Sequence, residues 1–155
     1  MNLDLLKKEY NEKGTVLFDL KNSFFDSTDF QSLEKVSKSI SYETVLIGDA
    51  GEKNKVEVGR FMTDVNKPEI VNNEYSEKVL NILNKKDYKK IFGKIISYNE
   101  ELYIRRVQVN KMSTNSFIGY HLDVDSNPDY IAAVVIQIGA SFTGGDYVVY
   151  TNKDD

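Results

Sequence analysis

The spacing of apolar residues changes near residue 94, and this change limits the fold of the chain more than any other feature. Before it, apolar residues mostly recur at intervals of three and four, the period of a helix with one buried face. After it, they alternate or run together, as from Tyr130 to Ile138, between turn residues every ~8–12 positions. The pattern predicts one α+β domain, residues 1–155, with a mixed helix and strand part (1–93) leading into a jelly-roll or barrel-like β part (94–155).

The same patterns place the individual elements. Helices are expected at 3–12, ended by Gly14, at 28–40, and at 75–92, the last closed by Gly93 and either continuous or broken near 85–87. Strands are expected at 15–20, 42–47, 56–62, 95–98, 102–112, 117–123, 130–138 and 146–150. Residues 52–55 are expected to form a turn. The continuous apolar run 130–138 is typical of a strand that is covered on both faces.

Charge and composition exclude several kinds of protein. The net charge of −4 argues against a nucleic-acid binder, which normally shows a basic face. The chain has no cysteine, which excludes disulfides, thiolate metal sites and cysteine nucleophiles. No apolar run approaches the ~18 residues of a membrane helix, and the first residues lack the layout of a secretion signal. We therefore expect a cytoplasmic protein that works outside the membrane.

The candidate site is built around His121, the only histidine of the chain, which is followed two residues later by Asp123. In an extended segment, residues two apart point to the same side, so the imidazole and the carboxylate would lie next to each other. These two groups are two of the three ligands in the 2-His-1-carboxylate site of non-haem iron oxygenases. A His-x-Asp triplet is also common by chance, and the alternative is a histidine that only hydrogen-bonds a neighbouring carboxylate.

Other features in the β part occur in a fixed order around this triplet. A strand precedes it, an aromatic residue stands four positions before the histidine, and an apolar strand and a Phe-x-Gly-Gly-Asp turn follow. In this chain they are Val107–Met112, Phe117, Ile131–Ile138 and Phe142-Thr143-Gly144-Gly145-Asp146. This order resembles the 2-oxoglutarate- and Fe(II)-dependent dioxygenase superfamily, most closely its prolyl-4-hydroxylase-like branch. The resemblance covers about residues 94–150.

The resemblance implies a double-stranded β-helix in which His121 and Asp123 bind Fe(II) and act as the catalytic pair. It further implies 2-oxoglutarate as small-molecule cosubstrate, ascorbate as an accessory reductant, and hydroxylation of a substrate such as a peptidyl proline. In the family, a tyrosine near the end of the preceding strand often bonds the cosubstrate. Here that region has Asn110 and Met112, and with Tyr120 these are the candidate cosubstrate-binding residues.

The chain departs from the family pattern after the Gly-Gly turn. The family has a third iron ligand, a second histidine, on a later strand, and beyond it an arginine or lysine for the distal carboxylate of 2-oxoglutarate. Here no histidine follows His121, no arginine follows Arg106, and Lys153 is the only cation after Lys111. Two explanations stay open. The chain is a fragment that lacks the C-terminal part of the domain, or it is a natural form that lacks turnover and covers its open edge by dimerising.

A rival hypothesis requires no chemistry. In it the chain is a non-catalytic β-sandwich module for binding or assembly, and His121 and Asp123 are ordinary residues at the edge of its core. Metal binding that depends on His121 separates the two hypotheses.

Overall fold

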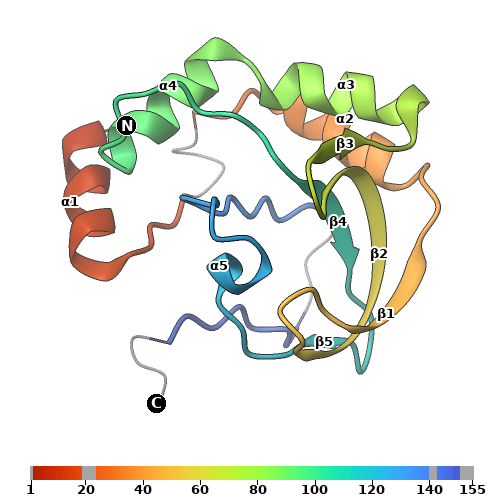
Figure 1. The fold of residues 1–155 in the computed structure, drawn as a ribbon. Coiled ribbons are helices and arrows are strands. Elements are labelled where there is room, and N and C mark those ends of the chain that lie inside the picture. Colours follow the sequence, from red (N-terminus) through yellow and green to blue (C-terminus); the bar gives the residue numbers. More distant parts are fainter. Residues whose placement is uncertain (1, 19–23, 140–142, 151–155) are drawn as a thin grey trace.

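The computed structural model describes residues 2–18, 24–139 and 143–150 (Figure 1). Within them are five helices: α1 (Leu3–Lys13), α2 (Ser27–Ser37), α3 (Asn73–Leu83), α4 (Lys86–Ile95) and the short α5 (Asp123–Ser126). The described strands are β1 (Glu43–Ile47), β2 (Lys53–Asp64), β3 (Pro68–Ile70), β4 (Val107–Lys111) and β5 (Phe117–Ile118). None of the described helices is long and apolar enough to span a bilayer.

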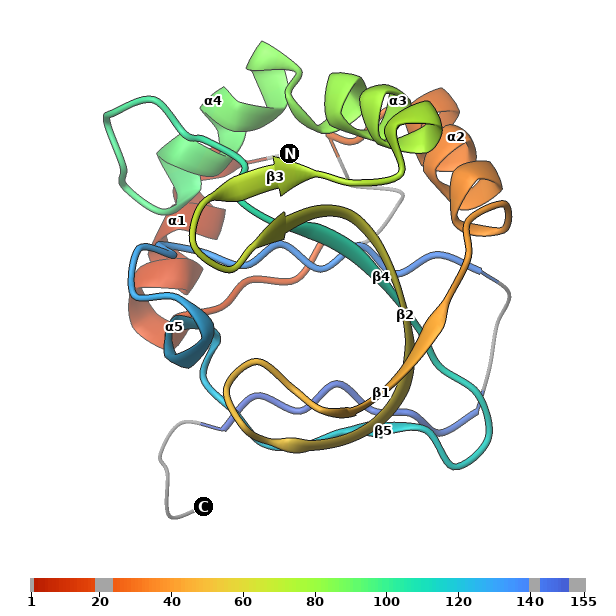
Figure 2. The same ribbon diagram turned by 45° about the vertical axis from the view of Figure 1, so that its right-hand side comes forward.

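β2 is the central strand of the sheet, because each of the other four described strands pairs with it in antiparallel orientation. β1 and β3 pair with its two halves on one edge, and β5 and β4 do so on the other. The register shifts between Arg60 and Met62, where β4 pairs, and such bulges bend a strand. Figure 2 shows the result, a strongly curved β2. Strands from both sides of residue 93 therefore share one sheet.

Two of the longer helices cover one face of this sheet. α3 and α2 lie along it, and α1 lies against α4 (Figure 1). Phe61 of β2, 2% exposed, enters a buried apolar cluster whose other members come from the helices and the residues next to them. These are Leu33, Val36, Ile40, Val79, Ile82 and Tyr88. Val107 and Val109 of β4 pack on the same cluster. By the alternation of a strand, Arg106, Gln108 and Asn110 face the opposite side.

The helix predictions are largely confirmed. α1 ends at Gly14, whose φ of 69° lies in the left-handed region and whose N–H bonds the Tyr10 carbonyl. The segment 75–92 is broken rather than continuous, because Lys85 is extended between α3 and α4 (φ −52°, ψ 127°). The prediction that Gly93 closes the helix is wrong. Gly93 lies inside α4, which continues to the buried Ile95, and the left-handed residue is Ser97 (φ 60°).

Several strand predictions are wrong at their boundaries. Residues 15–18 form no strand, and 19–20 lie outside the described residues. The predicted turn at 52–55 holds the first residues of β2, which also extends past 62. Residues 95–98 finish α4 and its cap instead of forming a strand. The strand expected at 102–112 covers only β4, since its ladder with β2 ends at the Met62–Val107 pair. In each case the period is visible in the sequence but the pairing partner is not.

The expected strands at 130–138 and 146–150 form no ladder with any described strand. Both run extended beside the curved sheet, as the blue trace in Figure 2 shows. The prediction that 130–138 is covered on both faces is wrong. Ile131, Val134 and Val135 are 51%, 54% and 61% exposed, whereas Ile136 packs on the core cluster. An apolar run shows that burial would be favourable, but a neighbouring layer is needed to provide it. The described part is thus a mixture of helices and an open antiparallel sheet.

Candidate metal centre

His121 and Asp123 lie next to each other, although the segment that carries them is not a strand throughout. β5 ends at Ile118, which pairs with Asn54, the second residue of β2. The predicted strand 117–123 is therefore only two residues long, and Asp123 begins α5. Leu122 is extended before it (φ −105°, ψ 137°). His121 Nε2 still lies 3.5 Å from Asp123 Oδ1.

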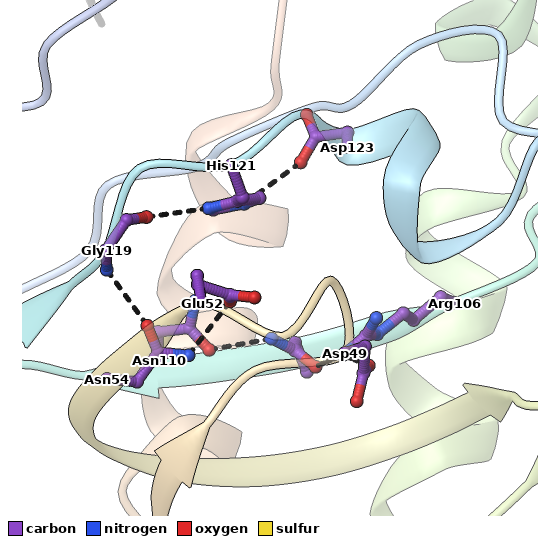
Figure 3. A network of polar contacts seen from close by, with 9 residues as sticks. Asp49, Glu52, Asn54, Arg106, Asn110, Gly119, His121 and Asp123 are labelled. Atoms are coloured by element: carbon purple, nitrogen blue, oxygen red, sulfur yellow. Dashed lines mark hydrogen bonds and ion pairs between the residues drawn. The ribbon is translucent and has the colours of Figure 1, made fainter.

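The two nitrogens of the His121 ring have different surroundings (Figure 3). Nδ1 lies 2.9 Å from the carbonyl oxygen of Gly119. A carbonyl can only accept, so this bond requires the proton on Nδ1, and in the neutral ring Nε2 then carries the lone pair. Nε2 is the nitrogen that faces the Asp123 carboxylate. Metal-ligating histidines commonly donate their other N–H to a backbone carbonyl in this way. An imidazole lone pair beside a carboxylate is a donor pair that suits Fe(II).

A second set of contacts connects Gly119 to the sheet. The Gly119 N–H donates to Asn54 Oδ1 at 2.9 Å, and Asn54 Nδ2 donates to Glu52 Oε1 at 2.9 Å. Asn54 is only 8% exposed. The backbone at Gly119 also lies so close to β2 that a Cβ there would be 2.5 Å from the Lys53 carbonyl oxygen. Only glycine allows this approach, so the loop that carries His121 is held against the first residues of β2.

Polar side chains line β4 on the face away from the helices. Arg106 forms an ion pair with Asp49, and its Nε and Nη2 donate to Gln108 Oε1 at 3.1 and 2.8 Å. Gln108 Nε2 donates to Asn110 Oδ1 at 2.8 Å. Figure 3 shows Asn110 on the same side of the sheet as His121 and Asn54. This row gives the sheet surface beside His121 a hydrogen-bonded, polar character.

A buried ion pair holds the turn that follows α5. The side chain of Asp64 at the end of β2 is 0% exposed and accepts from Arg105 Nε at 2.7 Å and Arg105 Nη2 at 3.3 Å. Asn127 Nδ2 donates to the same carboxylate at 3.1 Å, and Arg105 Nη1 also reaches Asp129 at 2.7 Å. The hydrogen bonds to Asp64 and Asp129 raise the pKa of Arg105. Both sides of the 119–129 segment are therefore attached to β2, through Asn54 and through Asp64.

Tyrosines of the last described segment approach the same region. The rings of Tyr120 and Tyr150 meet edge to face, with centroids 5.4 Å apart. Partial burial, and after it the negative charge of Asp123, raise the pKa of Tyr147. Residues 147–150 thus lie beside the segment 120–123.

The predicted site residues are only partly brought together. Asn110 faces the same side of the sheet as His121, whereas Tyr120 turns toward Tyr150, and Met112 follows the end of β4 and is 49% exposed. Phe142 and Lys153 lie outside the described residues. Asn54 and Glu52 were missed, because nothing in the sequence connects them to a residue 65 positions away. Within the described residues there is no cluster of three or more histidine, aspartate or glutamate side chains fit to hold a metal ion.

Comparisons with known proteins give a likeness among solved structures. No protein-family model matches the chain, and no curated protein sequence matches it. Among solved structures, the chain is similar to the crystal structure of an oxidoreductase of the 2OG-Fe(II) oxygenase family from Burkholderia pseudomallei, with 32% sequence identity and a TM-score of 0.74. The match covers 84% of this chain and 61% of that one. This likeness supports the superfamily resemblance and an oxygenase-like fold, while the prolyl-4-hydroxylase-like branch and the jelly roll stay predictions.

Proposed function

We propose that this chain contributes His121 Nε2 and Asp123 as two protein ligands of Fe(II) in a 2-oxoglutarate-dependent oxygenase site. The observation that carries the proposal is the state of the His121 ring. Its Nδ1 is bonded to the Gly119 carbonyl, and its Nε2 faces the carboxylate 3.5 Å away. The likeness to a 2OG-Fe(II) oxygenase family structure supports the choice of metal and cosubstrate.

Iron bound together with 2-oxoglutarate would activate O₂, which is the oxidant that hydroxylates a C–H bond while 2-oxoglutarate is oxidised to succinate and CO₂. The residues of this chain would hold and shape the site. His121 and Asp123 would bind the metal and leave other positions open, and Asn110 would offer an amide to the cosubstrate from the neighbouring strand. Met112 and Tyr120 are the more distant candidates for cosubstrate contact. The polar row on β4 would orient bound carboxylates by hydrogen bonds.

Two protein ligands hold Fe(II) weakly, and the sequence contains no second histidine. We therefore expect weak metal binding by this chain and little or no succinate formation. A peptidyl proline as substrate, ascorbate as accessory reductant and a jelly-roll core are finer proposals that rest on the family resemblance. A cytoplasmic setting and a homodimer are separate proposals that rest on the sequence.

Titration with Mn(II), followed by its electron paramagnetic resonance signal, tests the proposal. His121→Ala and Asp123→Ala should each abolish saturable binding, because each removes one of two ligands. Glu12→Ala, which removes an exposed carboxylate from α1, is the matched control and should bind like the unaltered chain. Equal Mn(II) binding by the unaltered chain and His121→Ala would refute the proposed site. Rapid Fe(II)-dependent succinate formation would refute the expectation of low turnover.

A non-catalytic binding or assembly module is the second candidate, and exposed apolar residues favour it. Val134, Val135 and the residues Tyr147, Val148, Val149 and Tyr150 are all at least 48% exposed. Apolar surface of this kind marks contact sites more often than free surface. Under this hypothesis His121→Ala changes neither metal binding nor self-association, and light scattering shows association that depends on protein concentration.

A further inference from the structure

We propose that Asn54 and Glu52 are positioning residues that select the tautomer of His121, so that Nε2 carries a lone pair where the metal would bind. The inference deepens the proposed function and rests on it for the role of Nε2. It starts from a chain of hydrogen bonds that runs from β2 to the imidazole (Figure 3). Its links join Glu52 to Asn54, Asn54 to Gly119 and Gly119 to His121.

The first step is the orientation of the Asn54 amide. Its oxygen accepts from the Gly119 N–H, and its nitrogen donates to Glu52 Oε1, each at 2.9 Å. If the amide were turned over, an NH2 group would face the Gly119 N–H and an oxygen would face the carboxylate. Both contacts would then be repulsive, so the Glu52 carboxylate permits only one orientation. Because Asn54 is only 8% exposed, water cannot readily take the place of either hydrogen-bond partner of its amide.

The second step is the position of Gly119. This residue has no side chain that could hold it, and its N–H is fixed by Asn54. The opposite end of the same residue is the carbonyl that accepts from His121 Nδ1. The close approach to the Lys53 carbonyl leaves little space for the loop to shift. The direction in which the Gly119 carbonyl points is therefore set from β2.

The third step is a competition for the imidazole proton. The Gly119 carbonyl, 2.9 Å from Nδ1, favours the proton on Nδ1. The Asp123 carboxylate, 3.5 Å from Nε2, favours it on Nε2, where it would block the nitrogen as a ligand. The contact of Nδ1 with the Gly119 carbonyl is the shorter of the two, so the proton stays on Nδ1 only while Gly119 is held in place. Loss of Asn54 or of Glu52 should thus move the proton to Nε2, even though neither residue touches the ring.

Nitrogen-15 NMR of the ring tests this directly, because His121 is the only histidine and its ring signals need no residue assignment. Couplings to the two ring C–H protons distinguish Nδ1 from Nε2. In metal-free protein at alkaline pH, where imidazole is neutral, the unaltered chain should show the proton on Nδ1. Asn54→Ala and Glu52→Ala should shift the ring toward the Nε2–H form. Glu52→Gln should keep the Nδ1–H form, because the amide oxygen can still accept from Asn54. Mn(II) affinity should fall about tenfold in the two alanine variants.

Asn72→Gly is the matched control. Asn72 Nδ2 donates to the Arg60 carbonyl at 2.6 Å, so this variant also removes an asparagine contact to β2, and glycine keeps its left-handed backbone (φ 51°). It should lose stability without a change of tautomer. An Asn54→Ala ring identical to the unaltered one, an Nε2–H form in the unaltered chain, or an equal shift in Asn72→Gly would each overturn the proposal.

Two safeguards keep the outcome decisive. If Asn54→Ala does not fold, the comparison of Glu52→Ala with Glu52→Gln carries the test, because Glu52 is less buried than Asn54. Failure of the proposed function shows differently from failure of this inference. An unaltered chain that binds no Mn(II) but changes tautomer on loss of Asn54 refutes the metal site alone. A chain that binds Mn(II) through His121 with an unchanged tautomer in both alanine variants refutes the positioning role alone.

Discussion

Replacing Gly119 by alanine should weaken both the fold and the metal site. The added Cβ would lie 2.5 Å from the Lys53 carbonyl oxygen and 3.4 Å from Glu52 Cβ. Backbone at that distance must move. Overpacking of this kind costs about 1–3 kcal/mol, and a lost bond from the Gly119 N–H to Asn54 costs about 1 kcal/mol more. Alanine also reduces the conformational freedom of the unfolded chain, which stabilises the folded state by about 0.5 kcal/mol. The expected net loss is about 1.5–3.5 kcal/mol, with at least a tenfold (~1.4 kcal/mol) lower Mn(II) affinity.

Urea unfolding followed by circular dichroism gives the stability, and Mn(II) titration gives the affinity. Gly59→Ala is the matched control on the same strand. A Cβ there would lie 2.3 Å from Ile40 Cδ1, on the face that packs against the helices. This variant should also lose about 1–3 kcal/mol but keep the Mn(II) affinity. The reasoning is refuted if Gly119→Ala unfolds at the same urea concentration as the unaltered chain, or if both glycine variants lose affinity equally.

Two further changes test other parts of the molecule. Asp64→Asn should lower the free energy of unfolding, measured by urea unfolding, by about 1–3 kcal/mol. The buried carboxylate of Asp64 accepts charged hydrogen bonds from Arg105, and a neutral amide cannot match them. Equal stability of the variant and the unaltered chain would contradict this role. Hydrogen bonds from the Thr28 side chain and from the Thr28 N–H lower the pKa of Asp26. The ionised Asp26 carboxylate therefore stabilises the fold above the ordinary aspartate pKa, and this stabilisation is lost as the pH falls through the lowered pKa. Asp26→Asn should therefore flatten the loss of stability on the acid side, measured by urea unfolding from pH 6 to pH 2, with little change at neutral pH because asparagine also caps helices.

Local features of the sequence predicted local features of the structure. The helical spacing of residues 3–12 and 28–40, together with Gly14, places α1 and α2 to within a few residues. Spacing of two between His121 and Asp123 is short enough that they lie 3.5 Å apart even though the strand stops at Ile118.

Pairing and burial could not be read in the same way. The strand boundaries failed where pairing with β2 stops short of the apolar pattern, as at 102–106 and 119–123. The run 130–138 is as apolar as a buried strand, yet Val135 is 61% exposed because no described layer covers it. Periodicity reports which side of a segment prefers burial, and it contains no information about the neighbour.

The sequence by itself determined the donor atoms of the site and the order in which the chain presents them, because chemistry and short spacing are properties of neighbouring residues. Only the tertiary structure decided the state of those donors. The tautomer of His121 depends on Gly119, and Gly119 depends on Asn54, which lies 65 positions earlier in the chain. Folding of β2 brings that asparagine to the loop, and contacts between distant segments exist only once the chain has folded.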